Sequence, residues 1–171
     1  KIAEEIEDFE AKSMAFLHIF NFTRNVEFLN KSVDYAIQSE QKDGMLLKIV
    51  ESITKKNKKK AEEIAKLIDR DYYRNKAYAT ILEQCNALEL AEKISCMRIL
   101  SSSLKRLSQN LDLPDSIEIA RMIPDPYYKA LALINIMERE EIEGLREEVN
   151  KTIEKVRSKY LKERLERELK T

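Results

Sequence analysis

The feature that most constrains the fold is a stretch of twenty residues that the chain contains twice. Residues 64–83 read IAKLIDRDYYRNKAYATILE, and residues 119–138 read IARMIPDPYYKALALINIME. Eight of the twenty positions are identical, and others exchange like for like, as Lys66 does with Arg121. Two near-copies in one short chain indicate that a single structural unit recurs along it.

The same frame extends toward the N-terminus without gaps. Placing Ile2 or Ser32 on Ile64 brings further residues into the same phase: Ala3, Ile6, Ala15 and Ile19 in the first case, and Val33, Ala36, Met45 and Ile49 in the second. Since the apolar residues recur every three or four positions, each unit is expected to be a pair of helices. We predict units at about 1–25, 26–56, 58–85, 86–112 and 113–138, which together form one helical-hairpin repeat domain over 1–138.

Composition supports helices throughout the chain. Two glycines among 171 residues are too few for the tight turns of a β-sandwich or a doubly wound sheet. Good helix formers such as Ala, Leu, Glu and Lys dominate instead, so we expect an all-α fold. The predicted helices, with ends defined to within a few residues, are 2–8, 10–22, 26–39, 41–55, 58–68, 71–85, 87–96, 98–109, 114–123, 126–139 and 142–169.

The last predicted helix differs from the others. Ile142, Leu145, Val149 and Ile153 mark one face, and the opposite face is nearly all charge. A terminal repeat needs a polar outer surface to end a stack. We therefore expect residues 139–171 to form a long amphipathic C-terminal helix that caps the same domain.

Small residues lie twelve positions apart across the expected turns of three units: Ala3 with Ala15, Ala65 with Ala77, and Ala120 with Ala132. Small side chains at facing positions let two antiparallel helices approach closely. With Ile64, Ala65, Ile68, Ala77 and Ile81, this pattern resembles the tetratricopeptide repeat and is similar to HEAT-like α-solenoid repeats. The resemblance implies a right-handed α-α superhelix of about five helical hairpins.

The sequence contains no motif typical of catalysis. A phosphate-binding loop needs several glycines, whereas Gly44 and Gly144 stand alone, and His18 is the single histidine. We expect His18 to be structural and expect no enzyme activity, no cofactor and no metal. A carboxylate-based site of an enzyme or regulatory subunit stays an alternative, although the nearest candidates are expected to favour helix N-termini by their charge: Glu4, Glu5, Glu62 and Glu63.

Cysteine content and hydropathy point to a cytoplasmic protein. Cys85 and Cys96 are too few for a disulfide framework and lack metal-ligand spacing, so we read them as reduced, buried residues. A bridge between them is the alternative if they lie on neighbouring antiparallel helices of a hyperthermophile protein, and the many Lys, Glu and Arg residues fit a thermophile. No apolar run approaches the roughly 20 residues of a membrane span.

Net charge does not favour nucleic acid or a membrane as the partner. Thirty-one basic and thirty-one acidic residues give a formal charge of zero. The densest basic cluster is KKNKKK at 55–60, which we read as a solvated turn between two helices. Non-specific contact of this run with phosphates is the alternative.

Four basic residues occupy the same phase of the repeat, early in the second helix of each unit: Lys12, Lys42, Arg74 and Lys129. Two tyrosine pairs, Tyr72–Tyr73 and Tyr127–Tyr128, also share one phase of the repeat. We expect one ring of each pair to pack between units and the other, Tyr72 or Tyr127, to lie at the surface, where tyrosine is favoured in interfaces. The basic row either pairs with acidic groups of the preceding helix or lines a groove that receives an acidic partner. These six residues are the tentative partner-binding set.

The sequence therefore predicts a non-catalytic scaffold of the helical-repeat type that binds a protein or peptide partner. This function follows from the architecture, since stacked hairpins build extended binding grooves. A nucleic-acid-associated protein that uses the basic patches is one alternative. Self-association through the C-terminal helix is another.

Overall fold

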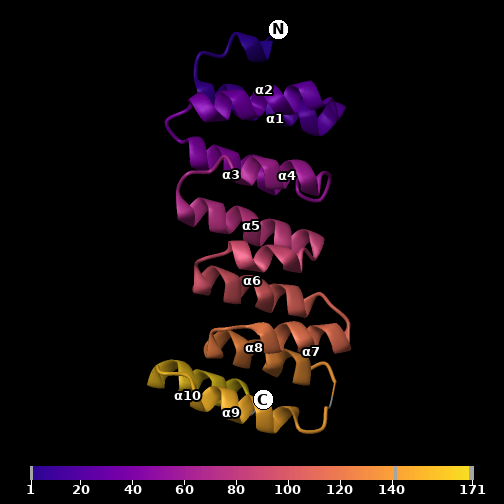
Figure 1. Cartoon of the computed structure of the whole chain (residues 1–171), viewed down its shortest axis with the longest axis vertical. Coiled ribbons are helices and arrows are strands. Elements are labelled where there is room, and N and C mark those ends of the chain that lie inside the picture. Colours follow the sequence, from indigo (N-terminus) through magenta and orange to yellow (C-terminus); the bar gives the residue numbers. More distant parts are fainter. Residues whose placement is uncertain (1, 141, 170–171) are drawn as a thin grey trace. The chain divides into compact units, whose positions relative to one another are not determined.

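The structure is a computed structural model, and it describes residues 2–140 and 142–169 (Figure 1). Every regular element within these ranges is helical, which confirms the all-α prediction. Lys1, Glu141, Lys170 and Thr171 lie outside the described residues, so the expected first unit (1–25) and the expected cap (139–171) are described only in part. The chain divides into two compact units, Lys1–Ser95 and Cys96–Thr171.

The first unit consists of helices that pack on their neighbours in the chain. Its elements are η1 (Ile2–Glu4), α1 (Phe9–Thr23), α2 (Val26–Gln38), α3 (Lys42–Ile53), α4 (Lys58–Ala65), α5 (Asp71–Cys85) and the 3-10 helix η2 (Leu88–Lys93). Helix α2 packs on α1 and α3, and α3 also packs on α4 and α5. Helix α5 also packs on α4, which precedes it in the chain, and on η2, which follows it.

The second unit follows the same scheme. Its elements are α6 (Met97–Gln109), α7 (Leu113–Met122), α8 (Pro126–Met137), α9 (Leu145–Glu154) and α10 (Lys159–Glu168). Helix α6 packs on α7 and α8, as α3 packs on α4 and α5 in the first unit. Helix α8 in turn packs on α9 and α10.

One burial pattern recurs in the first helix of each pair and the residues that follow it. In α4 and its C-terminal extension, four positions spaced 0, 3, 4 and 7 are at most 2% exposed: Ala61, Ile64, Ala65 and Ile68. The equivalent buried residues are Leu29, Ser32, Val33 and Ala36 in α2, Ser116, Ile119, Ala120 and Ile123 in and after α7, and Val149, Thr152, Ile153 and Val156 in and after α9. This spacing places all four side chains on one face of a helix, so the sequence repeat is also a repeat of burial.

The prediction of one long C-terminal helix over 142–169 is wrong. The chain forms two helices, α9 and α10, because Ser158 takes an extended conformation (φ −77°, ψ 118°) and starts a new helix. Its side chain accepts a hydrogen bond from the Leu161 N–H, which is the function of an N-cap. The break gives α10 its own orientation, in which Leu165 is fully buried.

Two further predicted helices are also wrong. Residues 2–8 form only the 3-10 turn η1, because Asp8 is extended and caps α1 by accepting the Ala11 N–H at 2.6 Å. A capping residue cannot also continue a helix from the segment before it. Of residues 87–96 only Leu88–Lys93 are helical, as the 3-10 helix η2, and the extended conformation of Ile94 ends it.

A buried carboxylate joins consecutive hairpins in the first unit. Asp43, in the first turn of α3, is 4% exposed. Its two oxygens accept the N–H groups of Asp69 and Arg70 at 3.0 Å each, and the Arg70 Nε at 2.9 Å. These donors belong to the turn between α4 and α5, so a side chain of one hairpin fixes the backbone of the next. Burial raises the pKa of Asp43, but the three hydrogen bonds outweigh it and leave this pKa below its ordinary value.

Other polar residues near the start of the second helix of a pair make comparable contacts. Asn75 of α5 donates to the Ser95 hydroxyl at 3.2 Å, and Ser101 of α6 accepts the Asp125 N–H at 3.2 Å. Ser13 of α1 instead donates to the Ser32 carbonyl within α2, at 2.8 Å. We call Asp43, Asn75 and Ser101 the polar clasp.

Replacing Asp43 with asparagine tests the clasp. Because the pKa of Asp43 is lowered in the folded protein, its contribution to stability is complete above about pH 4 and is lost as the pH falls through the folded pKa. We expect Asp43→Asn to lower the free energy of unfolding by about 2 kcal/mol at pH 7. The difference from wild type should shrink toward pH 3 in urea titrations. Asp34→Asn, on an exposed position of α2, is the matched control, and an equal pH dependence of both variants would contradict this assignment.

Candidate partner-binding surface

The basic residues of the shared repeat phase lie where they were expected, in the first turn of the second helix of each pair. Arg74 Nη1 donates to the carbonyls of Ile68 and Asp69 at 3.1 and 2.9 Å. Lys129 Nζ donates to the Arg121 carbonyl at 2.8 Å. Lys129 therefore meets a carbonyl in the last turn of α7, where the helix dipole favours positive charge. Arg74 meets carbonyls of the turn between α4 and α5.

The two remaining basic residues contact the following hairpin. Lys42 Nζ lies 2.9 Å from Asp69 Oδ2, and Lys12 Nζ lies 4.9 Å from the centre of the Tyr35 ring. Lys12, Lys42 and Arg74 belong to the first unit, and Lys129 belongs to the second. Each of the four has a contact within its own unit.

The first turn of α5 carries an exposed aromatic cluster. The rings of Tyr72 and Tyr73 meet edge to face with centroids 5.4 Å apart, and Tyr72 is 56% exposed. Lys76 Nζ lies 4.6 Å from the Tyr72 ring, and the Arg70 guanidinium lies 4.6 Å from the Tyr73 ring. We call Arg70, Tyr72, Tyr73 and Lys76 the tyrosine surface. The sequence reading missed Arg70 and Lys76, although their spacing of three and four residues from a tyrosine on one helix was a usable signal.

The second unit repeats part of this arrangement on α8. Tyr127 and Tyr128 also meet edge to face, with centroids 5.6 Å apart. A hydrogen bond with Tyr128 raises the pKa of Arg98. Tyr127 is half-buried, so it offers less free surface than Tyr72 does.

Comparisons with known proteins do not assign this chain to a family. No family model matches the chain. No curated protein and no solved structure matches it either. The resemblance to tetratricopeptide and HEAT-like repeats stays a prediction from the sequence.

The basic run at 55–60 spans the end of the α3–α4 turn and the first turn of α4. Lys58 pairs with Glu89, and Lys60 Nζ lies 3.3 Å from Glu63 Oε2. Lys56 Nζ donates to Asn21 Oδ1 at 2.7 Å. Much of the run is therefore engaged within the protein, and phosphate binding by it stays an untested alternative.

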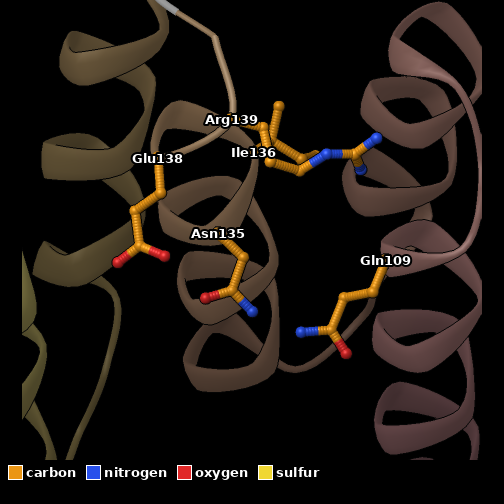
Figure 2. Close-up of a pocket in the computed structure, with 5 residues that line it drawn as sticks. All are labelled: Gln109, Asn135, Ile136, Glu138 and Arg139. Carbon is orange, nitrogen blue, oxygen red and sulfur yellow. The ribbon is translucent and has the colours of Figure 1, made fainter.

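A pocket of about 370 Å³ lies in the second unit (Figure 2). It is lined by Gln109 at the end of α6 and by residues at and after the end of α8: Asn135, Ile136, Glu138 and Arg139. Arg139 donates to the Leu111 carbonyl at 3.1 Å. Small-molecule sites are mostly apolar and enclosed, whereas Ile136 is the one apolar side chain of this lining. The pocket carries no functional assignment.

The residues considered for chemistry are dispersed. Within 2–140 and 142–169, no group of three or more His, Cys, Asp or Glu side chains is placed to hold a metal ion. Of the carboxylates considered as an alternative site, Glu4, Glu62 and Glu63 pair with Lys31, Lys93 and Lys60. His18 is exposed on α1. No helix in the described part of the chain combines the length and the apolar character that crossing a membrane requires.

Cys85 and Cys96 fall in different units, Cys85 in the first and Cys96 in the second. The Cys85 thiol is half-buried and donates to the Thr54 carbonyl at 3.5 Å. Burial raises the pKa of Cys85, which favours the thiol over the reactive thiolate. Cys85 and Cys96 are both half-buried, so the expectation that they are buried is wrong.

Removing the Arg74 guanidinium distinguishes a role of this group in the fold from a role in partner binding. If it holds the turn between α4 and α5, Arg74→Met should lower the free energy of unfolding by about 1 kcal/mol, because two carbonyls lose their donor. Lys48→Met, on an exposed position of α3, is the control and should change stability by less than about 0.5 kcal/mol. Equal stability of both variants in urea denaturation would instead favour an Arg74 that is available to a partner.

Proposed function

We propose that this chain is a non-catalytic helical-repeat scaffold that binds a protein or peptide segment at the tyrosine surface. The observation that supports this most is the tyrosine pair repeated at the start of α5 and α8, with Tyr72 56% exposed. Tyrosine and arginine are enriched at the energetically dominant positions of protein interfaces. Tyr78 of the same helix, by contrast, is enclosed at 6% exposure.

The proposal includes the finer architecture expected from the sequence, a right-handed α-α superhelix of about five hairpins similar to tetratricopeptide or HEAT-like repeats. Its support is the burial of the same four positions in successive hairpins. A hairpin of this kind leaves an apolar face open unless the next hairpin covers it. The proposal also keeps the cytoplasmic location that the sequence predicts.

The chemistry of the tyrosine surface suggests the kind of segment it would bind. Lys76 and Arg70 lie against the two rings, so apolar faces and positive charge occur together. The Arg70 side chain is 61% exposed although its Nε is bound to Asp43. A segment with an apolar side chain next to carboxylates complements this combination. Lys42 and Arg74, already paired, are assigned to holding the surface in place.

A comparative pull-down tests the proposal. The tagged 171-residue chain, as wild type and as Tyr72→Ser, is incubated with the same native lysate, and recovered proteins are quantified by mass spectrometry. We expect a stoichiometric partner whose recovery falls at least about tenfold with Tyr72→Ser. Tyr160→Ser, at a tyrosine of α10 that is 68% exposed, is the matched control and should retain the partner. Identical recovery with wild type and Tyr72→Ser, or no stoichiometric partner at all, would refute the assignment.

A further inference from the structure

Most cations on and beside the tyrosine surface are bound to carboxylates of the same unit. Three ion pairs account for them: Arg70 with Asp43, Lys42 with Asp69, and Arg74 with Asp71. In each pair the positive charge has a negative charge directly beside it, which reduces its attraction for an acidic group of a partner.

Lys76 is the exception among these cations. Within the described part of the chain it forms no ion pair, and its Nζ lies 4.6 Å from the centre of the Tyr72 ring. Lys76 is exposed, and Tyr72 is 56% exposed. A positive charge without a counter-charge therefore lies against an aromatic ring that a ligand can reach.

The second copy of the repeat indicates that the fold does not require a charge at this position. Arg74 and Lys129 share one phase of the repeat, and both donate to backbone carbonyls. Lys76, by contrast, corresponds to Leu131 of α8. A helix at this place in the repeat therefore forms without a cation there, so we assign the charge of Lys76 to binding.

From these contacts we infer that Lys76 selects the partner segment by binding the carboxylate of one Asp or Glu side chain. This inference rests on the proposed function, because the same segment places an apolar side chain against Tyr72. Since the ammonium group and the ring are in contact, the acidic and the apolar residue are neighbours in an extended segment or lie one turn apart on a helix.

A single carboxylate is favoured over a phosphate group or a run of acidic residues. Asp69 and Asp71 lie on either side of Arg70 in the sequence, and their side chains are 77% and 75% exposed. A segment with several negative charges would approach these carboxylates as well as Lys76, and like charges repel each other. The surface offers one unpaired positive charge, which one carboxylate neutralises.

A displayed library of short random peptides tests the inference. The library is selected on the wild-type 171-residue chain and counter-selected on Tyr72→Ser. Enriched peptides are synthesised with blocked ends, so that side chains supply their only carboxylates. Their affinities for wild type, Lys76→Gln and Lys76→Glu are measured by fluorescence anisotropy at about 0.1 M and about 1 M salt. Lys48→Gln, at an exposed position of α3, is the matched control.

We expect the enriched peptides to carry one Asp or Glu near an apolar residue. Lys76→Gln should weaken their binding about fivefold at the lower salt concentration, the upper value for an exposed ion pair. The loss should shrink at the higher concentration, because salt screens the pair. Lys48→Gln should leave the affinity unchanged. Lys76→Glu should instead bind the peptide in which lysine replaces the acidic residue.

The outcomes separate this inference from the proposed function. Peptides that depend on Tyr72 but lack an acidic residue, or that carry runs of acidic residues, would overturn the inference and leave the proposed function in place. Equal affinity of wild type and Lys76→Gln for the selected peptides would do the same. Selection of no peptide that depends on Tyr72 would overturn both.

Discussion

The Asp43 carboxylate, which binds the turn between α4 and α5, is the interaction on which the first unit depends. It accepts the N–H groups of Asp69 and Arg70, which a helix-to-helix turn would otherwise leave without intrahelical partners. Apolar packing is non-directional. It determines how much surface the helices bury more strictly than it determines which residues of neighbouring helices face each other. A charged hydrogen-bond acceptor has a defined geometry, so the Asp43 carboxylate orients the α4–α5 turn relative to α3. The position of α5, and of Tyr72 on its first turn, follows from this contact.

Periodicity in the sequence predicted most of the helices because each one has to bury one face. Helix α5 was expected at 71–85 and spans Asp71–Cys85. The break at Ser158 was not predictable in this way, since Val156 and Leu165 fit one continuous stripe as well as two shorter ones. A local hydrogen bond to the Leu161 N–H decided between them. Composition likewise could not distinguish the 3-10 helix η2 from a regular helix, because its residues, LELAEK, are all good α-helix formers.

The candidate surface was predictable in part. The shared phase of Arg74 and Lys129 was visible in the sequence, but their acceptors were not, because both donate to backbone carbonyls, which every residue has. The sequence reading left open whether this row serves the fold or a partner, and the contacts favour the fold. Tyr72 was correctly expected at the surface. Arg70, which contacts both Asp43 and the Tyr73 ring, connects the clasp to that surface.

The central claim is that a polar side chain of one hairpin fixes the turn of the next, and amide hydrogen exchange of the Arg70 N–H tests it most directly. If the Asp43 carboxylate holds this turn, the Arg70 amide should exchange as slowly as the Ile81 amide inside α5, with the same dependence on denaturant, because both would open only when the hairpin unfolds. Exchange of the Arg70 amide at the rate of an exposed loop, with Ile81 still protected, would contradict the account.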